Sequence, residues 1–270
     1  ITAFLFVAEI SLTQSTYVDV LTDDQLGEPL ESDDWDLPPE NLRGILALPN
    51  DVYVGFTGNQ ICFSEQGRPH AWPVRFRLNT DFPIVAIGNV DTTVVIGTES
   101  FVYIASGSEP AAYSMSKFEV PYACSSKRSF DYLTGIGVVF SNPDGLMAVQ
   151  GVGQIHNLTD SVFTREQWQA LHPESILAVV HDDVYHFFFD PVYSPSGVPA
   201  GYAIDTKPDG FGVVSLGYHA TAACTDPRRD ALFMVLDLVD EPDAAYLPQA
   251  STAPVPGGMT IYEFDADDAS

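Results

Sequence analysis

Short apolar runs separated by polar turns recur along most of this chain. The clearest example is Ser129–Gly151, where three apolar runs are joined by a glycine-containing turn and by Asn142–Gly145. Val138–Phe140 and Leu146–Val149 have the length and the β-branched or bulky side chains of strands, and the proline and glycine of the second turn suit a tight reversal. The stretch therefore predicts a meander of antiparallel strands.

The same pattern repeats along the chain. The first apolar runs of five units begin at Ile45, Ile84, Phe130, Ile176 and Ala222, so the offset is 39 residues once and then 46 residues three times. A period of about 40–45 residues with about four strands is typical of β-propeller blades. A single irregular β-sandwich also spaces short strands regularly and is the alternative. We predict an all-β chain with a β-propeller-like domain of repeated antiparallel meanders.

The residues before this repeat have a different pattern. Phe4–Ala8 and Thr16–Val20 alternate loosely and are joined by a polar turn, which predicts a hairpin from an incomplete N-terminal immunoglobulin-like β segment. Glu31–Glu40 is acidic and non-periodic, and is interpreted as a linker with Trp35 as an anchor onto the next domain. The predicted domains are 1–30, the end of a β-sandwich-like segment; 31–43, an acidic linker; and 44–270, the β-propeller-like domain.

Three features interrupt or flank the repeat. A helix is predicted at Thr164–His172, with Thr164 and Gln167 as a capping box and Phe163 and Trp168 as the matching hydrophobic staple. Two proline-rich polar stretches, 190–200 and 237–258, are predicted to be surface insertions available to partners. The chain begins with Ile1 and lacks the basic segment of a signal peptide, so its start is interpreted as internal or processed.

The charge distribution narrows the classes of function. The formal net charge is −26, and from Glu9 to Glu40 there are ten acidic residues and no Lys or Arg. All 11 basic residues lie between Arg43 and Arg229, and nine more acidic residues follow the last of them. Such a surface repels phosphate backbones and argues against a protein that grips nucleic acid, although charge that serves solubility alone is the alternative. No apolar run is long enough to span a bilayer.

The cysteines and histidines give no metal-binding pattern. Cys62, Cys124 and Cys224 have no ligand spacing and are predicted to be buried free thiols, as expected for assembly in a reducing cytosol. His181 and His186 lie an odd number of residues apart on what reads as one strand. Alternation then places them on opposite faces, which argues against a shared metal.

One loop concentrates unusual side chains. Arg68, His70 and Trp72 lie close together in Glu65–Pro73 and either form a ligand cradle or serve as a packing plug with polar groups that cap backbone carbonyls; the structural role is favoured. No GxSxG, HExxH or phosphate-binding glycine loop is present, and paired carboxylates cannot be recognised without the fold. We therefore predict no catalytic, metal-binding or cofactor-binding residue and no cofactor. The candidate interface or structural residues are Arg68, His70, Trp72, Trp35 and Trp168.

Three phrases carry a resemblance to a known family. They are SEQGRPHAWP at Ser64–Pro73, SFDYLTGIGVVFSNPDGLMAV at Ser129–Val149 and FTREQWQALHP at Phe163–Pro173. With them, the span Glu28–Asp190 resembles the tail nozzle (tail tubular) proteins of tailed bacteriophages and prophages. The C-terminal third is similar only in its general β character.

The resemblance implies a non-enzymatic virion structural protein, assembled in the bacterial cytoplasm and resident in the phage tail. Copies of such proteins form a ring, typically a hexamer, that contacts the portal, the adaptor and the tail fibres and passes double-stranded DNA without binding it specifically. An acidic lumen would repel DNA over a Debye length of about 8–10 Å. With only five units evident, the chain is expected to be a fragment or to be completed by donated strands. The alternatives are a receptor- or carbohydrate-binding β-propeller at the tail tip and a propeller glycosidase.

Overall fold

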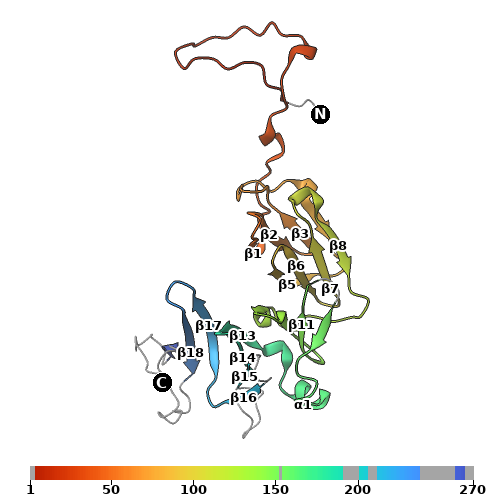
Figure 1. The fold of residues 1–270 in the computed structure, drawn as a ribbon, viewed down its shortest axis with the longest axis vertical. Helices are drawn as coiled ribbons and strands as arrows, with labels where there is room; N and C mark the ends of the chain where they lie inside the picture. The colour runs from red at the N-terminus through yellow and green to blue at the C-terminus, as the bar shows by residue number, and fades with distance from the viewer. Residues whose placement is uncertain (1–3, 152–153, 191–200, 206–211, 238–258, 265–270) are drawn as a thin grey trace.

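The chain folds into five antiparallel sheets that follow one another along the sequence (Figure 1). The computed structural model describes residues 4–151, 154–190, 201–205, 212–237 and 259–264. Each sheet is a meander in which every strand pairs with the next one, and we number them blades 1 to 5. The predicted unit starts fall within two residues of the first strand of each blade, so the predicted repeat is confirmed and the single β-sandwich is wrong.

The strands have the following bounds. Blade 1 contains β1 (Arg43–Ala47), β2 (Tyr53–Thr57), β3 (Gln60–Phe63) and β4 (Arg77–Asn79), and blade 2 contains β5 (Ile84–Val90), β6 (Thr93–Thr98), β7 (Val102–Ser106) and β8 (Ser114–Lys117). Blade 3 contains β9 (Asp131–Leu133), β10 (Gly137–Asn142), β11 (Gly145–Val149) and β12 (Ile155–Asn157). Blade 4 contains β13 (Leu177–His181), β14 (Val184–Phe188), β15 (Gly201–Asp205) and β16 (Gly212–Leu216). Blade 5 has three strands within the described residues, β17 (Ala220–Asp226), β18 (Ala231–Asp237) and β19 (Met259–Phe264).

The blades are arranged as in a β-propeller. The first strand of each blade contacts the first strand of the next, from β1 to β5, β9, β13 and β17 in turn. In Figure 1 these strands lie on the inner side of an arc, and the later strands of blades 1, 2 and 4 lie farther out. The arc is open between β1 and β17 in this view. The structure is therefore all-β and propeller-like.

Alternating side chains pack each blade against both of its neighbours. On β6, Val94 and Ile96 belong to the core shared with blade 1, whereas Val95 packs toward blade 3. On β10, Val138 and Phe140 pack toward blade 2, whereas Val139 packs toward blade 4. Because a strand that is covered on both sides needs apolar residues at every position, the middle blades have continuous apolar runs instead of an alternating pattern. This two-sided burial explains the apolar runs that revealed the repeat.

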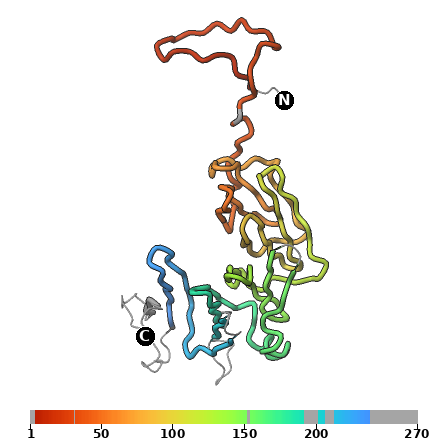
Figure 2. Tube along the Cα trace, viewed as in Figure 1, coloured from red at the N-terminus to blue at the C-terminus, as the bar shows by residue number. Residues whose placement is uncertain are grey.

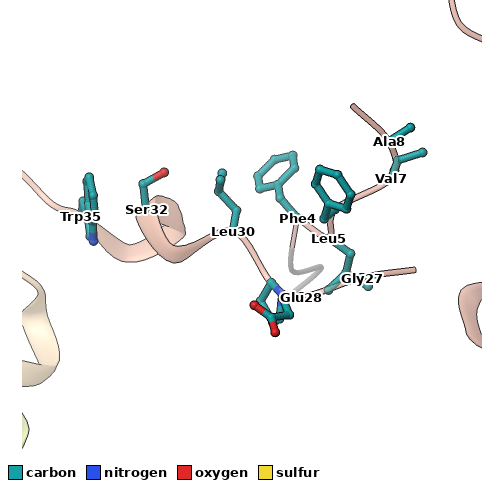
Figure 3. Close-up of a pocket in the computed structure, with 11 residues that line it drawn as sticks. Phe4, Leu5, Val7, Ala8, Gly27, Glu28, Leu30, Ser32 and Trp35 are labelled. Carbon is teal, nitrogen blue, oxygen red and sulfur yellow. The ribbon is translucent and has the colours of Figure 1, made fainter. Parts of the chain in front are cut away.

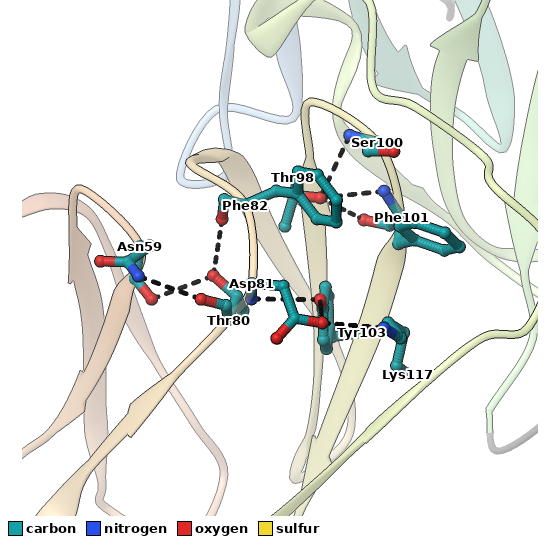
Figure 4. Close-up of polar contacts among 9 residues, drawn as sticks. All are labelled: Asn59, Thr80, Asp81, Phe82, Thr98, Ser100, Phe101, Tyr103 and Lys117. Carbon is teal, nitrogen blue, oxygen red and sulfur yellow. Dashed lines mark hydrogen bonds and ion pairs between the residues drawn. The ribbon is translucent and has the colours of Figure 1, made fainter.

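Polar contacts support the junction of blades 1 and 2 (Figure 4). The Asp81 carboxylate accepts hydrogen bonds from Tyr103 at 3.0 Å and from Lys117 at 2.7 Å. Thr80 directly precedes Asp81, and its hydroxyl oxygen lies 2.7 Å from the Phe82 carbonyl oxygen and 2.9 Å from the Asn59 carbonyl oxygen. The hydroxyl has one hydrogen and donates it to one of these two carbonyls. The hydrogen bond from Lys117, reinforced by Tyr103, holds the pKa of Asp81 below its usual value of 3.8. These contacts fix the crossing from β4 to β5.

One α-helix, α1 (Arg165–Ala170), decorates the connection between blades 3 and 4. Its predicted capping box between Thr164 and Gln167 is confirmed, and the Phe163 and Trp168 rings lie 5.9 Å apart, as the staple requires. Trp168 is 1% exposed and donates its Nε1 hydrogen to the Asn142 carbonyl at 2.8 Å. The remaining helical turns are η1 (Asp23–Gln25), η2 (Glu31–Asp34), η3 (Val74–Phe76), η4 (Pro110–Ala112), η5 (Lys127–Ser129) and η6 (Pro173–Ser175).

The N-terminal segment differs from the predicted hairpin. The backbone of Phe4–Phe6 pairs with Gly27–Leu30, with hydrogen bonds of 2.7–3.0 Å, and residues 16–20 form no strand. Residues 7–26 instead form a wide loop that projects away from the blades (Figure 2). Val18 and Val20 are 77% and 78% exposed, so among the described residues no surface covers their side chains. Membership of an immunoglobulin-like domain stays a prediction.

Two further expectations meet the structure differently. Cys62 and Cys124 are buried free thiols as predicted, and burial raises the pKa of Cys124 to about 12. Cys224 is free but exposed, which contradicts the prediction, because β17 turns alternate residues away from blade 4.

The predicted insertions 190–200 and 237–258 lie outside the described residues except for Asp190 and Asp237. No described helix is long and apolar enough to cross a bilayer.

Candidate functional site

The loop that carries Arg68, His70 and Trp72 is closed on itself. Backbone hydrogen bonds join Glu65 to Ala71 at 2.9 Å and Arg68 to Glu65 at 3.1 Å, and Gly67 supplies the positive φ of 67° that the turn needs. Trp72 is 2% exposed and donates its Nε1 hydrogen to the Pro69 carbonyl at 2.9 Å. Trp72 is therefore a buried plug that holds the loop, with no surface free for a ligand.

The acidic linker docks against this loop. The backbone N–H of Trp72 donates to the Asp36 carbonyl at 2.8 Å, and the N–H of Val74 donates to Asp36 Oδ2 at 3.2 Å. Arg75 forms ion pairs with Asp34 of the linker and, at 2.7 Å, with Glu65 of the loop. Exposed ion pairs contribute at most about 1 kcal/mol each, so the backbone hydrogen bonds and ring contacts set the position of the linker.

Three of the predicted residues meet on the surface of blade 1. The Trp35 ring lies edge-on to His70, with ring centroids 5.5 Å apart, and the Arg68 guanidinium lies 5.3 Å from the Trp35 ring centre. Trp35, Arg68 and Arg75, with Glu65 and Gln66, line a hollow of about 380 Å³. We call Trp35, Arg68 and His70, together with the other residues that line this hollow, the Trp35 cluster. Trp168 lies apart from it, in the core between blades 3 and 4.

A larger hollow lies beside the cluster, on the N-terminal segment (Figure 3). Its volume is about 910 Å³, and it is lined by Phe4–Ala8 and Gly27–Leu30 with Ser32 and Trp35. Figure 3 shows Phe4 and Leu30 on one side of this segment and Glu28 on the other. We call residues 4–30 the N-terminal arm. Sequence reasoning assigned this arm to a hairpin of an incomplete immunoglobulin-like β segment and did not predict a hollow lined by its apolar side chains.

The arm exposes an unusual number of large apolar side chains. They are Phe4, Leu5, Phe6, Ile10, Leu12, Tyr17, Val18, Val20 and Leu30. Scattered exposed apolar residues are normal, but Phe4, Leu5, Phe6 and Leu30 line one hollow, and such a group is typical of an interaction surface. One feature of the sequence could have indicated this surface: an apolar segment lies outside the blade repeat, in a region with no basic residue.

The two histidines of blade 4 also lie differently from the expectation. His181 pairs with Val184, and His186 pairs with Val179, across the β13–β14 hairpin. The prediction of opposite faces is wrong because residues 182 and 183 form the hairpin turn, both with positive φ, so the chain reverses between the histidines. In a sheet, two residues that pair directly across neighbouring strands lie on the same face, and so do alternate residues of one strand. His186 pairs with Val179, and Val179 lies two residues before His181, so both imidazoles lie on the face of blade 4 that packs toward blade 5.

Comparison with known proteins assigns no function to the chain. No family model and no curated protein matches the chain. Similar solved structures include the N-terminal domain of Nup159 (13% identity, 73% of this chain and 57% of that chain, TM-score 0.40) and the tricorn protease (16% identity, 80% and 22%, TM-score 0.45). The AfRom2 CNH domain is 11% identical over 92% of this chain and 87% of that chain, with a TM-score of 0.36. None of these three is a phage tail protein, and at these scores they carry no functional argument.

Proposed function

We propose that this β-propeller-type chain is a non-enzymatic structural protein of a phage tail, which joins neighbouring subunits through its N-terminal arm. The exposed apolar surface of the arm carries the proposal. Phe4, Phe6 and Leu12 are 68%, 58% and 106% exposed. Burying one such side chain contributes about 1.5–3 kcal/mol, so an arm that carries several of them has a strong drive to pack against a partner.

We take a second copy of this chain as that partner. Ten acidic residues and no base lie between Glu9 and Glu40, whereas every basic residue lies at or between Arg43 and Arg229, on or between the blades. The segment from Arg43 to Arg229 also contains 18 acidic residues, so the body is net negative and the apolar side chains, not opposite net charges, drive the contact between arm and body. Contacts of arm to body are head-to-tail, and such contacts form a ring when the rotation between neighbouring subunits closes and an open filament when it does not. A hexameric ring that contacts a portal, an adaptor and tail fibres, in a virion assembled in the bacterial cytoplasm, fits the family resemblance.

The proposal also locates a DNA passage. Of the five inner strands, β1, β5 and β13 contain no Asp or Glu, and β9 and β17 contain one each, Asp131 and Asp226. Because the inner strands carry so few acidic residues, the proposal puts an acid-lined conduit for double-stranded DNA in transit between subunits of the ring. Repulsion by the acidic subunit surfaces keeps the DNA from binding as it passes.

The assembly test compares a double variant of the arm with a matched control. We expect the full chain to form rings in solution, seen by light scattering and electron microscopy. Phe4→Asp combined with Phe6→Asp should leave monomers with unchanged circular dichroism, because both side chains are exposed and outside the blades. Val214→Asp changes a 60% exposed side chain on β16 and should still assemble. A monomeric wild type, or a double variant that assembles equally well, would contradict the proposal.

A receptor- or carbohydrate-binding propeller is the second candidate. The Trp35 cluster favours it, because an aromatic ring beside charged groups in a hollow of about 380 Å³ suits a polar ligand. Binding of oligosaccharides that is lost in Trp35→Ala while rings still form would support this candidate over the first. Hydrolysis of glycosides by the purified chain would instead support the propeller glycosidase.

A further inference from the structure

Two tight turns, one from blade 4 and one from blade 5, bring a histidine and two aspartates together. His181 ends β13, Asp182 begins the turn to β14, and Asp230 ends the turn between β17 and β18. One ligand atom from each of the three residues lies within 4.8 Å of the other two. Asp182 and Asp230 both have a φ of 50°, a conformation that Asp tolerates in tight turns. Two hairpin tips therefore present carboxylates to one imidazole.

The imidazole distinguishes this cluster from an ordinary group of surface acids. The His181 side chain is 8% exposed, and its Nε2 lies 3.6 Å from Asp182 Oδ2, which is too far for a hydrogen bond. Nε2 is buried and makes no hydrogen bond to any part of the chain that the structure describes. Buried polar atoms normally have a partner, so a nitrogen left without one in a group with two carboxylates indicates a missing ligand.

We propose that His181, Asp182 and Asp230 bind a divalent transition-metal ion, for which Zn²⁺ is the best fit. Imidazole and carboxylate bind Zn²⁺ at about 2.0–2.2 Å, which places the donor atoms of a tetrahedral site about 3.4 Å apart. Both aspartate side chains are exposed, so modest rotations bring their oxygens to this spacing. Three protein ligands leave the fourth position to water. Mg²⁺ and Ca²⁺ are disfavoured because they prefer oxygen ligands alone.

The surrounding charges permit a cation. Arg228 and Arg229 lie in the same turn as Asp230; Arg228 is exposed, and the Arg229 guanidinium lies 5.3 Å from the Phe233 ring centre. Asp226 is already engaged, because its carboxylate accepts the backbone N–H of Arg228 at 2.9 Å.

The metal would link two blades. Blades 4 and 5 already share an apolar core that includes Val179, Phe188 and Met234. The proposed site joins the tips of their hairpins beside that core, so metal binding fixes blade 5 to the rest of the arc. This role is independent of the arm and of the phage tail proposal.

The experiment titrates Zn²⁺ into the full chain, stripped of metal with a chelator, in competition with a chromophoric chelator. We expect one Zn²⁺ per chain at this site and at least tenfold weaker binding in Asp230→Asn. Asp183→Asn changes the adjacent turn residue outside the cluster and should bind as the wild type does. Both substitutions keep a side chain that tolerates positive φ, and circular dichroism verifies that the blades remain folded.

X-ray absorption of the zinc-loaded chain provides a readout that stability alone does not affect. A coordination shell with one imidazole nitrogen supports the site, and Asp182→Asn should weaken zinc binding as Asp230→Asn does. Equal zinc affinity in Asp230→Asn and Asp183→Asn overturns the proposal. So does an oxygen-only shell, which is the result expected if zinc binds only to the many other acidic residues.

Discussion

Individual side chains take their roles from neighbours that are distant in the sequence. Arg68, His70 and Trp72 were recognised as one unusual group from their spacing, but the structure divides them. Trp72 is a buried plug, whereas Arg68 and His70 contact Trp35 of the linker. Nothing in the local pattern distinguishes these roles, because they depend on the hydrogen bond between the backbones of Trp72 and Asp36.

The lowered pKa of Asp81 predicts that the unfolding free energy of the chain depends on pH. Its pKa is lowered by the hydrogen bond from Lys117, so its contribution to folding is present above the usual value of 3.8 and is lost as the pH falls below that value. We expect Asp81→Asn to reduce the acid dependence of the urea unfolding free energy between pH 5 and pH 3. The same acid slope in the variant and the wild type would refute this.

The comparison must use the variant and not the wild type alone. Burial raises the pKa of Asp131, and that shift has the opposite sign, because a raised carboxyl pKa makes the folded chain more stable as the pH falls. As the pH falls, Asp81 and Asp131 therefore change the unfolding free energy of the wild type in opposite directions. Subtracting the unfolding free energies of Asp81→Asn from those of the wild type isolates the contribution of Asp81.

At the scale of elements, the turns decided what the strand patterns left open. The strands of blade 3 were predicted nearly residue by residue, since its apolar runs are strand-length and its second turn contains Pro143 and Gly145. The stretch from Leu177 to Phe188 was treated as one strand instead of two. Asp182 and Asp183 give a weaker turn signal than proline or glycine, and missing that turn reversed the faces of the histidines.

Glycine at the first hairpin of blade 3 provides a test of element geometry. Gly137 has a φ of 110°, and a Cβ there would collide with the Val149 carbonyl oxygen of the neighbouring strand. We expect Gly137→Ala to destabilise the chain by at least about 2 kcal/mol more than Gly135→Ala, measured by urea unfolding. Gly135 also has a positive φ, of 75°, but open space around it, so it controls for backbone strain alone. Similar losses for both variants would disprove the steric argument.

The whole molecule is an arc of blades with a projecting arm, and the two parts obey different rules. The blades bury apolar residues against each other, and their order follows from the order of the chain. The arm has no such partner within the described residues, and its apolar side chains remain exposed. Its conformation in a ring therefore depends on a surface that lies in another subunit.

Hydrogen exchange tests this difference at the same scale. The amides of Phe6, Gly27 and Leu30 are bonded only across the narrow neck of the arm and should exchange rapidly in the monomer. They should become protected when rings form, whereas amides of β6 and β10 should be protected in both states. Equally rapid exchange of the arm amides in assembled rings would show that the arm is not the contact between subunits.

The order of residues alone predicts the all-β class, the five repeats and the helix between blades 3 and 4, because each rests on local rules: strand-length apolar runs, turn residues and a capping box. Which side chains meet depends on the fold. Trp35 met Arg68 and His70, His181 met Asp230, and the arm was left without a partner. These outcomes depend on how blades and linker lie in space, and no periodicity along the chain specifies contacts between residues so far apart.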